Sequence, residues 1–93
     1  MPASAAQLTR PRRQVEIDEA NPDLEIVRSL TNQRRLTAAQ ARTRFGAILA
    51  LLAAYPDLSH AQLGRYAGCS ASRMSGLVGE ACTAFGVSLD QPV

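Results

Sequence analysis

A single glycine, Gly68, separates two stretches of helical apolar spacing, and it constrains the fold more than any other residue. Before it, Ser59 and Gln62 have the spacing of a capping box, which predicts a short helix over about residues 60–67. Gly68 follows where the chain leaves that helix, a place that favours a residue able to adopt left-handed backbone geometry. The sequence therefore predicts a short helix that ends in a tight turn.

After this turn, Ser70 is placed to cap a longer helix. We expect that helix over residues 70–85, and Gly86 follows at the position that ends it. The apolar residues of this helix recur at helical spacing, namely Met74, Leu77, Val78, Ala81, Cys82 and Phe85. Two helices joined by a very short turn are thus expected.

Two further helices are predicted upstream. Thr37 and Gln40 form another capping box, and Pro56 disfavours helical geometry at the residue before it, so a helix is expected between them. The apolar stripe of that helix is Phe45, Ile48, Leu49 and Leu52. The pair Asn21–Pro22 opens the other helix over about 22–34, with Leu24, Val27 and Leu30 at helical spacing.

The N-terminal residues lack such a pattern. Residues 1–14 contain Pro, Ala, Ser and arginines without periodic apolar spacing, and we interpret 1–20 as a flexible arm. The alternation over residues 14–17 fits either a short strand or an extended part of the arm. Residues 21–93 are then expected to form one helical domain.

The composition favours close packing of helices. Hydrophobic residues make up 46% of the chain and aromatic residues only 4%, so Ala, Leu, Val and Ile must build the core. A chain of 93 residues buries only about 60–65% of its unfolded surface. A second subunit could complete so modest a core, and a homodimer is the expected assembly.

Residues 60–77 resemble the helix-turn-helix of bacterial and phage transcriptional regulators. Small and apolar residues occupy the positions that this family uses, namely Leu63, Gly64, Ala67, Gly68, Cys69, Met74 and Leu77. The resemblance extends over about residues 37–86 to the core of winged-helix regulators, but the residues after it are too few for a two-stranded wing. It implies an all-α fold: a small trihelical helix-turn-helix domain with an extra N-terminal helix and a flexible basic arm.

The same resemblance implies a sequence-specific DNA-binding protein, a small transcriptional regulator that acts as a repressor or an accessory factor. The helix over 70–85 would lie in the major groove of double-stranded DNA and read bases through Ser70, Ala71, Ser72, Arg73, Ser75 and Gly76. Phosphate contacts are expected from Ser59, Gln62, Arg65, Arg42 and Arg44. The arm would enter a minor groove through Arg10, Arg12 and Arg13, but composition alone favours an unspecific disordered tail. Arg65 can equally be a solvated helix residue.

The charges leave a second interpretation open, that of a protein-binding module, such as an antiactivator or an assembly partner, whose helix-turn-helix core does not bind DNA. The expected reading helix has one long basic residue, Arg73, and two glycines at positions 76 and 79. Five acidic residues lie between Glu16 and Glu25, and five arginines follow between Arg28 and Arg44. These blocks can neutralise each other, within or between subunits, or form two solvated faces. All ten basic residues are arginine, which suits phosphate and guanine, but a GC-rich genome explains that choice equally well.

Other classes of protein find less support. The sequence has one histidine, His60, which we expect at the surface, and it lacks a nucleophile motif, a glycine-rich phosphate loop and an acidic pair, so no enzyme activity is predicted. Cys69 and Cys82 lack zinc or redox spacing and are interpreted as small buried hydrophobes, with no metal and no cofactor expected. The longest apolar run, 47–55, is too short for a membrane span, and no secretory signal precedes Arg10, so a cytoplasmic location is expected.

Overall fold

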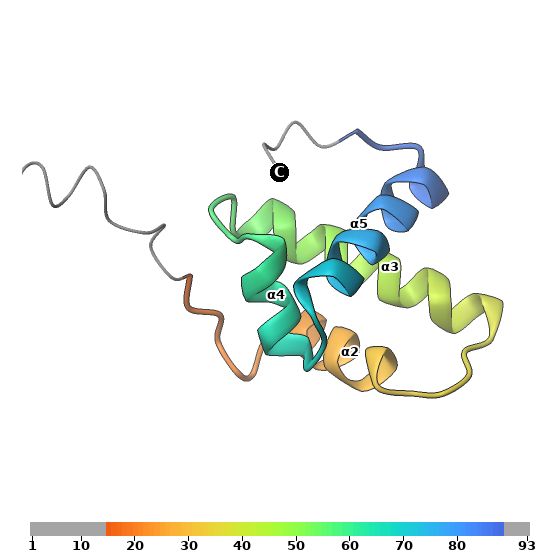
Figure 1. Cartoon of the computed structure of the whole chain (residues 1–93), viewed down its shortest axis with the longest axis horizontal. Coiled ribbons are helices and arrows are strands. Elements are labelled where there is room, and N and C mark those ends of the chain that lie inside the picture. The colour runs from red at the N-terminus through yellow and green to blue at the C-terminus, as the bar shows by residue number, and fades with distance from the viewer. Residues whose placement is uncertain (1–14, 89–93) are drawn as a thin grey trace, which may run out of the picture.

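A computed structural model describes residues 15–88, and within them every regular element is a helix (Figure 1). In chain order the helices are α2 (Pro22–Thr31), α3 (Ala38–Ala54), α4 (His60–Ala67) and α5 (Ala71–Phe85). The all-α prediction is therefore confirmed for the described residues, and residues 37–88 contain no strand of a wing.

Local capping signals set the ends of the last three helices. At the start of α3, the Thr37 hydroxyl accepts a hydrogen bond from the Gln40 backbone N–H at 3.1 Å, and the Gln40 side chain accepts one from the Thr37 N–H at 3.0 Å. Gly68 and Gly86 end α4 and α5 with φ of 83° and 65°, the left-handed geometry that favours glycine. These predicted boundaries are confirmed, because caps act over a few neighbouring residues.

Helix α2 ends at Thr31, earlier than the predicted limit at residue 34. Asn32 ends it, because the Asn32 side-chain amide donates a hydrogen bond to the Arg28 carbonyl at 2.7 Å. The same amide lies 3.2 Å from the carbonyl oxygen of Ala67, at the end of α4. Asn32 thus caps α2 locally and also links the end of α2 to the end of α4.

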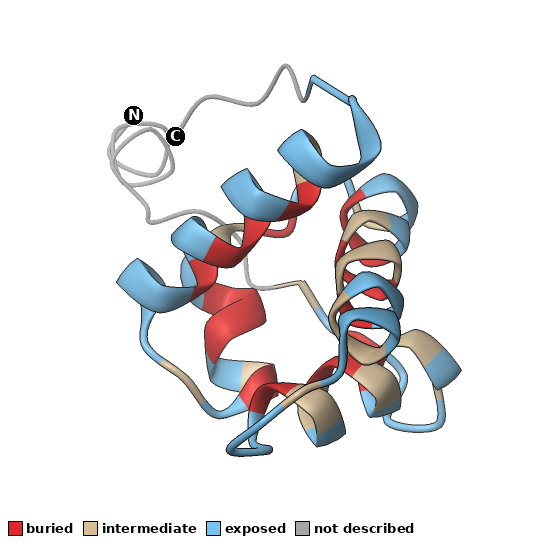
Figure 2. Ribbon diagram, turned by 90° about the vertical axis from the view of Figure 1, so that its right-hand side faces the viewer, coloured by how far each residue is buried: buried red, intermediate tan, exposed pale blue. Residues whose placement is uncertain are grey.

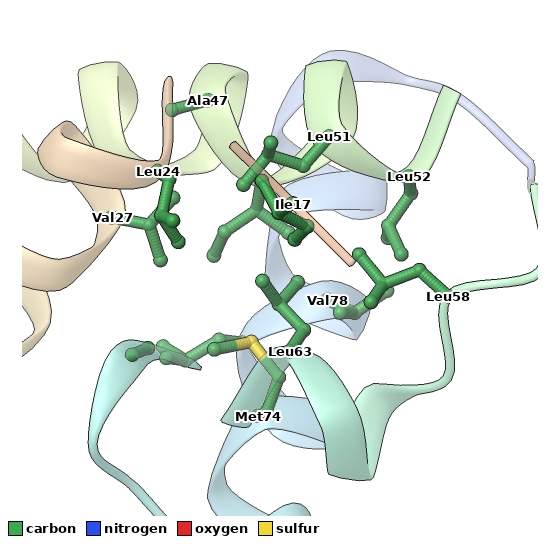
Figure 3. Packing of buried hydrophobic residues seen from close by; sticks show 13 residues of the cluster. Ile17, Leu24, Val27, Ala47, Leu51, Leu52, Leu58, Leu63, Met74 and Val78 are labelled. Carbon is green, nitrogen blue, oxygen red and sulfur yellow. The ribbon is translucent and has the colours of Figure 1, made fainter. Parts of the chain in front are cut away.

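The four helices form a ring of packed pairs. Helix α2 packs against α3 and α4, and α5 packs against the same two helices from the other side. Buried residues face the inside of this ring, and exposed residues face outward (Figure 2). The centre is filled by aliphatic side chains with fractional exposures of 0–5%, which Figure 3 shows as sticks: Ile17, Leu24, Val27, Ala47, Ile48, Leu51, Leu52, Leu58, Leu63, Ala67, Met74, Leu77 and Val78.

The packed domain begins before residue 21, where the sequence placed its start. Ile17 is only 5% exposed and lies within the core cluster (Figure 3). Its backbone N–H donates to the Tyr66 hydroxyl at 3.1 Å, and that hydroxyl donates to the carbonyl of Val15 at 3.2 Å. Residues 15–17 therefore form a segment without regular secondary structure that has one buried side chain, Ile17. The arm arginines Arg10, Arg12 and Arg13 lie outside the described residues.

Candidate nucleic-acid interface

Helix α5 has one buried face and one face made of small exposed residues. Met74, Leu77, Val78 and Ala81 are at most 4% exposed. All residues predicted to read bases are exposed, namely Ser70, Ala71, Ser72, Arg73, Ser75 and Gly76. The Ser70 hydroxyl is already engaged as the helix cap, because it accepts from the Arg73 backbone N–H at 3.1 Å. Arg73 is therefore the long side chain among the predicted base-reading residues, and Glu80 is a second long exposed side chain further along α5.

The outward face of α5 is open at its glycines. A Cβ added at Gly76 or at Gly79 would meet no atom within 4 Å, so neither glycine is required by packing within the chain. Each costs the helix about 0.5–1 kcal/mol relative to alanine. Neither packing nor backbone geometry within the described residues explains why glycine stands at positions 76 and 79.

The crossing of α4 and α5 does require a glycine, at position 64. A Cβ added at Gly64 would lie 3.0 Å from the carbonyl oxygen of Cys69 and 3.1 Å from that of Ser70. The Cys69 N–H also donates to the Gly64 carbonyl at 2.8 Å. The turn backbone thus lies directly against α4, as the small residue at this position predicted.

One pair of side chains joins α4 to the outward face of α5. Nδ1 of His60, in the first turn of α4, lies 3.0 Å from the Ser75 hydroxyl oxygen. The sequence placed His60 at the surface without a partner. Nothing in its pattern identifies this pair, because fifteen residues and a turn separate the two side chains.

The residues predicted to contact phosphates do not gather on one surface. The Ser59 hydroxyl accepts from the Gln62 backbone N–H at 3.1 Å, which makes it the α4 cap. Gln62 is only 7% exposed, and its side-chain oxygen accepts from the Val15 N–H at 3.4 Å. Arg65 is exposed, and it lines a shallow hollow beside the N-terminal segment, together with Val15, Glu19, Arg28, Gln62 and Tyr66. Gln62 and Arg65 thus lie on the side of α4 that meets this segment.

The two arginines predicted on α3 differ from each other. Arg42 is exposed, and its guanidinium lies 5.0 Å from the centre of the Phe85 ring. Arg44 is only 8% exposed, and its Nε has no hydrogen-bond partner. Burial lowers the pKa of the Arg44 guanidinium, and the positive charge of Arg73 lowers it further. Because Arg44 is almost fully buried, its position does not support the predicted phosphate contact.

One ion pair links the acidic and basic blocks of the sequence. The Arg28 guanidinium lies 3.0 Å from the Glu19 carboxylate, and its Nε donates to the backbone carbonyl of Tyr66 at 3.1 Å. This pair fixes residue 19 against α2 and α4. The blocks therefore neutralise each other at one place within the chain.

The structure offers no group of ligands for a metal among residues 15–88. Cys69 and Cys82 are free thiols, half-buried and packed against the core, close to the buried role that the sequence predicted. No helix in the described part of the chain is long and apolar enough to cross a membrane.

Comparison with known proteins adds no relative. No protein-family model matches the chain, and no similar curated protein or solved structure was found. The proposals below rest on the residues and contacts of this chain.

Proposed function

We propose that this protein binds double-stranded DNA as a small transcriptional regulator, a repressor or an accessory factor, with α4 and α5 acting as a helix-turn-helix. The observation that carries the proposal is the two-faced α5 helix. Its apolar face is fixed in the core. Its other face presents short side chains and Arg73 over the first turns, beside a tight crossing with α4, and Glu80 follows further along the helix. A helix with so little bulk on its outer face can approach the floor of the major groove closely.

The charged groups support this use of α5. Arg73 can donate two hydrogen bonds to the edge of a guanine, and the hydroxyls of Ser72 and Ser75 can contact bases or phosphates. Arg42 and Arg65 are exposed and can approach phosphates on either side of the groove. The net charge of +2 makes no strong attraction by itself, so binding depends on where these arginines lie.

A protein-binding module is the second candidate, and two observations favour it. Gly76 and Gly79 have no neighbour within the chain, so they would also permit a close approach by a helix of another protein. Phe85 and Val87 are 41% and 42% exposed, and large apolar residues at a surface are typical of protein interfaces. If the protein is a protein-binding module, the outer face of α5 contacts the partner protein.

Ser75→Glu separates the two candidates. A carboxylate at this exposed position would face phosphates in a DNA complex, so we expect affinity to fall by about 1–3 kcal/mol. Stability should change by no more than about 0.5 kcal/mol, since the position is exposed. Affinity is measured by fluorescence anisotropy at fixed salt, on a duplex selected by the protein from a random pool, together with the melting temperature.

Thr83→Glu is the matched control, because it adds the same charge to an exposed position two turns further along α5. It should weaken binding less than Ser75→Glu. If Ser75→Glu stays folded and binds the duplex as tightly as the parent, α5 does not read DNA. The protein-binding function then becomes the better account.

We further propose a homodimer that forms through α2. An apolar hollow between α2 and α3 is lined by Ile26 and Leu30, both of which are only half-buried within one chain. Symmetric regulators read half-sites about one helical turn apart, which a dimer would match. Light scattering should give twice the monomer mass, and Ile26→Glu should return it to the monomer. A monomeric parent, both with and without DNA, would refute the proposal.

A further inference from the structure

The contact between His60 and Ser75 joins the two helices of the proposed DNA-binding surface. His60 is half-buried in the first turn of α4, and Ser75 is exposed on the outer face of α5. Their hydrogen bond, 3.0 Å between Nδ1 and the hydroxyl oxygen, fixes the position of the Ser75 hydroxyl. The other ring nitrogen of His60, Nε2, has no hydrogen-bond partner within the described residues. The pair therefore holds one hydroxyl in place and leaves one ring nitrogen for an external group.

The number of hydrogen atoms that the pair can donate outward depends on the charge of the ring. A neutral imidazole carries one N–H and serine one O–H, and their mutual bond uses one of the two. One donor then remains for an external acceptor, whichever tautomer is present. A protonated ring carries two N–H groups, so the pair keeps two donors after its mutual bond is made. Protonation thus doubles the outward donors and adds a positive charge.

The surroundings of His60 contain few fixed charges. The charged residues of α5 are Arg73 and Glu80, and Asp57 precedes α4 in the connecting loop. On α2, the other helix that packs against α4, the charged residues are Asp23, Glu25 and Arg28, and Arg28 contacts the opposite end of α4 at Tyr66. The first turn of a helix disfavours a positive charge, whereas a nearby phosphate favours it. DNA would therefore add phosphate charges to the single carboxylate of Asp57 at this end of α4.

We propose that His60 and Ser75 form a proton-coupled DNA contact, in which the protonated pair donates one hydrogen bond to a phosphate and one to an acceptor on a base edge. This inference rests on the proposed DNA-binding function and names a residue that sets its pH dependence. Because the bound state favours the protonated ring, binding takes up a proton. Affinity then rises as the pH falls through the range in which histidine titrates, about pH 5–8.

The test measures anisotropy of a fluorescein-labelled, mixed-sequence duplex of about 20–30 base pairs across this pH range, at constant ionic strength. We expect the parent to bind about three- to tenfold more tightly at the acidic end, because binding takes up one proton. His60→Asn keeps a hydrogen-bonding atom near the position of Nδ1 but does not titrate, so its affinity should be independent of pH. Thr83→Ala removes a hydroxyl elsewhere on α5 and should retain the parent's pH dependence.

His60 is the single histidine of the chain, so its ring protons give an independent readout by NMR. Their titration midpoint should move to higher pH when the duplex is added, and Ser75→Ala should reduce that movement. If the parent binds but His60→Asn shows the same pH dependence, or if the midpoint does not move, the inference is wrong and the proposed function stands. If the parent binds no duplex at any pH, the proposed function itself fails, and this inference fails with it.

Discussion

The two sides of α4 are held by different kinds of interaction. Toward α5, Leu63 and Ala67 are fully buried, and Gly64 lies against the backbone of the turn. Toward α2 and the N-terminal segment, hydrogen bonds accompany the buried Ile17 side chain. The Tyr66 hydroxyl accepts from the Ile17 N–H and donates to the Val15 carbonyl, and Arg28 Nε donates to the Tyr66 carbonyl. We call the first side the apolar junction and the second the polar junction.

This difference has a consequence for stability. Removing a buried aliphatic group loses its transfer free energy and leaves a cavity, whereas a hydrogen bond between partly exposed groups is largely replaced by bonds to water. We therefore expect the apolar junction to open only when the whole domain unfolds. The polar junction can open locally, and the N-terminal segment with it.

The largest effect is expected from Leu63→Ala, on the apolar side. Leu63 is completely buried between the helices, so the substitution should lower the free energy of unfolding by about 2–5 kcal/mol. Urea unfolding followed by circular dichroism measures the change. Leu77→Ala, at a residue that is 4% exposed, should give a loss of the same order. A melting temperature equal to that of the parent in either variant would contradict the helix packing described above.

A smaller effect is expected from Gly64→Ala at the same junction. Alanine favours the helix by about 0.5–1 kcal/mol, but its Cβ would lie 3.0 Å from a backbone carbonyl oxygen, and overpacking costs about 1–3 kcal/mol. We expect the cost of overpacking to exceed the gain in helix propensity, because the backbone of the turn cannot move aside as a side chain can. The free energy of unfolding should therefore fall.

Gly76→Ala on α5 is the control for this substitution. No atom lies within 4 Å of the added Cβ, so the same exchange should stabilise the domain by about 0.5–1 kcal/mol. Opposite signs at positions 64 and 76 would confirm the close crossing. Stabilisation at both positions would show that the turn can move away from α4.

The most local effect is expected from Tyr66→Phe, on the polar side. It removes two hydrogen bonds to the N-terminal segment, each of which contributes about 0.5–1.5 kcal/mol at most. The sharper readout is local, since the Ile17 N–H loses its acceptor and should exchange with solvent faster. Tyr55→Phe removes the hydroxyl of a half-buried tyrosine elsewhere in the domain and should leave the exchange rate of the Ile17 N–H unchanged. Unchanged exchange at Ile17 in Tyr66→Phe would show that the buried Ile17 side chain alone holds the segment.

The sequence predicted the helices better than it predicted the contacts of the interface. The caps at Thr37, Ser59 and Ser70 and the glycines at 68 and 86 each act on backbone groups within a few residues, so local pattern is sufficient to place α3, α4 and α5. The outward face of α5 was predicted for the same reason, because helical spacing that identifies the buried residues also identifies the exposed ones.

The remaining features depend on residues that are far apart in the chain. Arg44 is buried because α3 packs against α5, Gln62 is covered by a segment 47 residues before it, and Asn32 links the end of α2 to the end of α4. No local pattern specifies these neighbours. The sequence by itself determined which residues form helices and which face of each helix is apolar, since both follow from backbone capping and side-chain spacing. Only the tertiary structure decided which polar side chains are free to meet a ligand, because burial and hydrogen bonding between distant segments depend on how the helices pack.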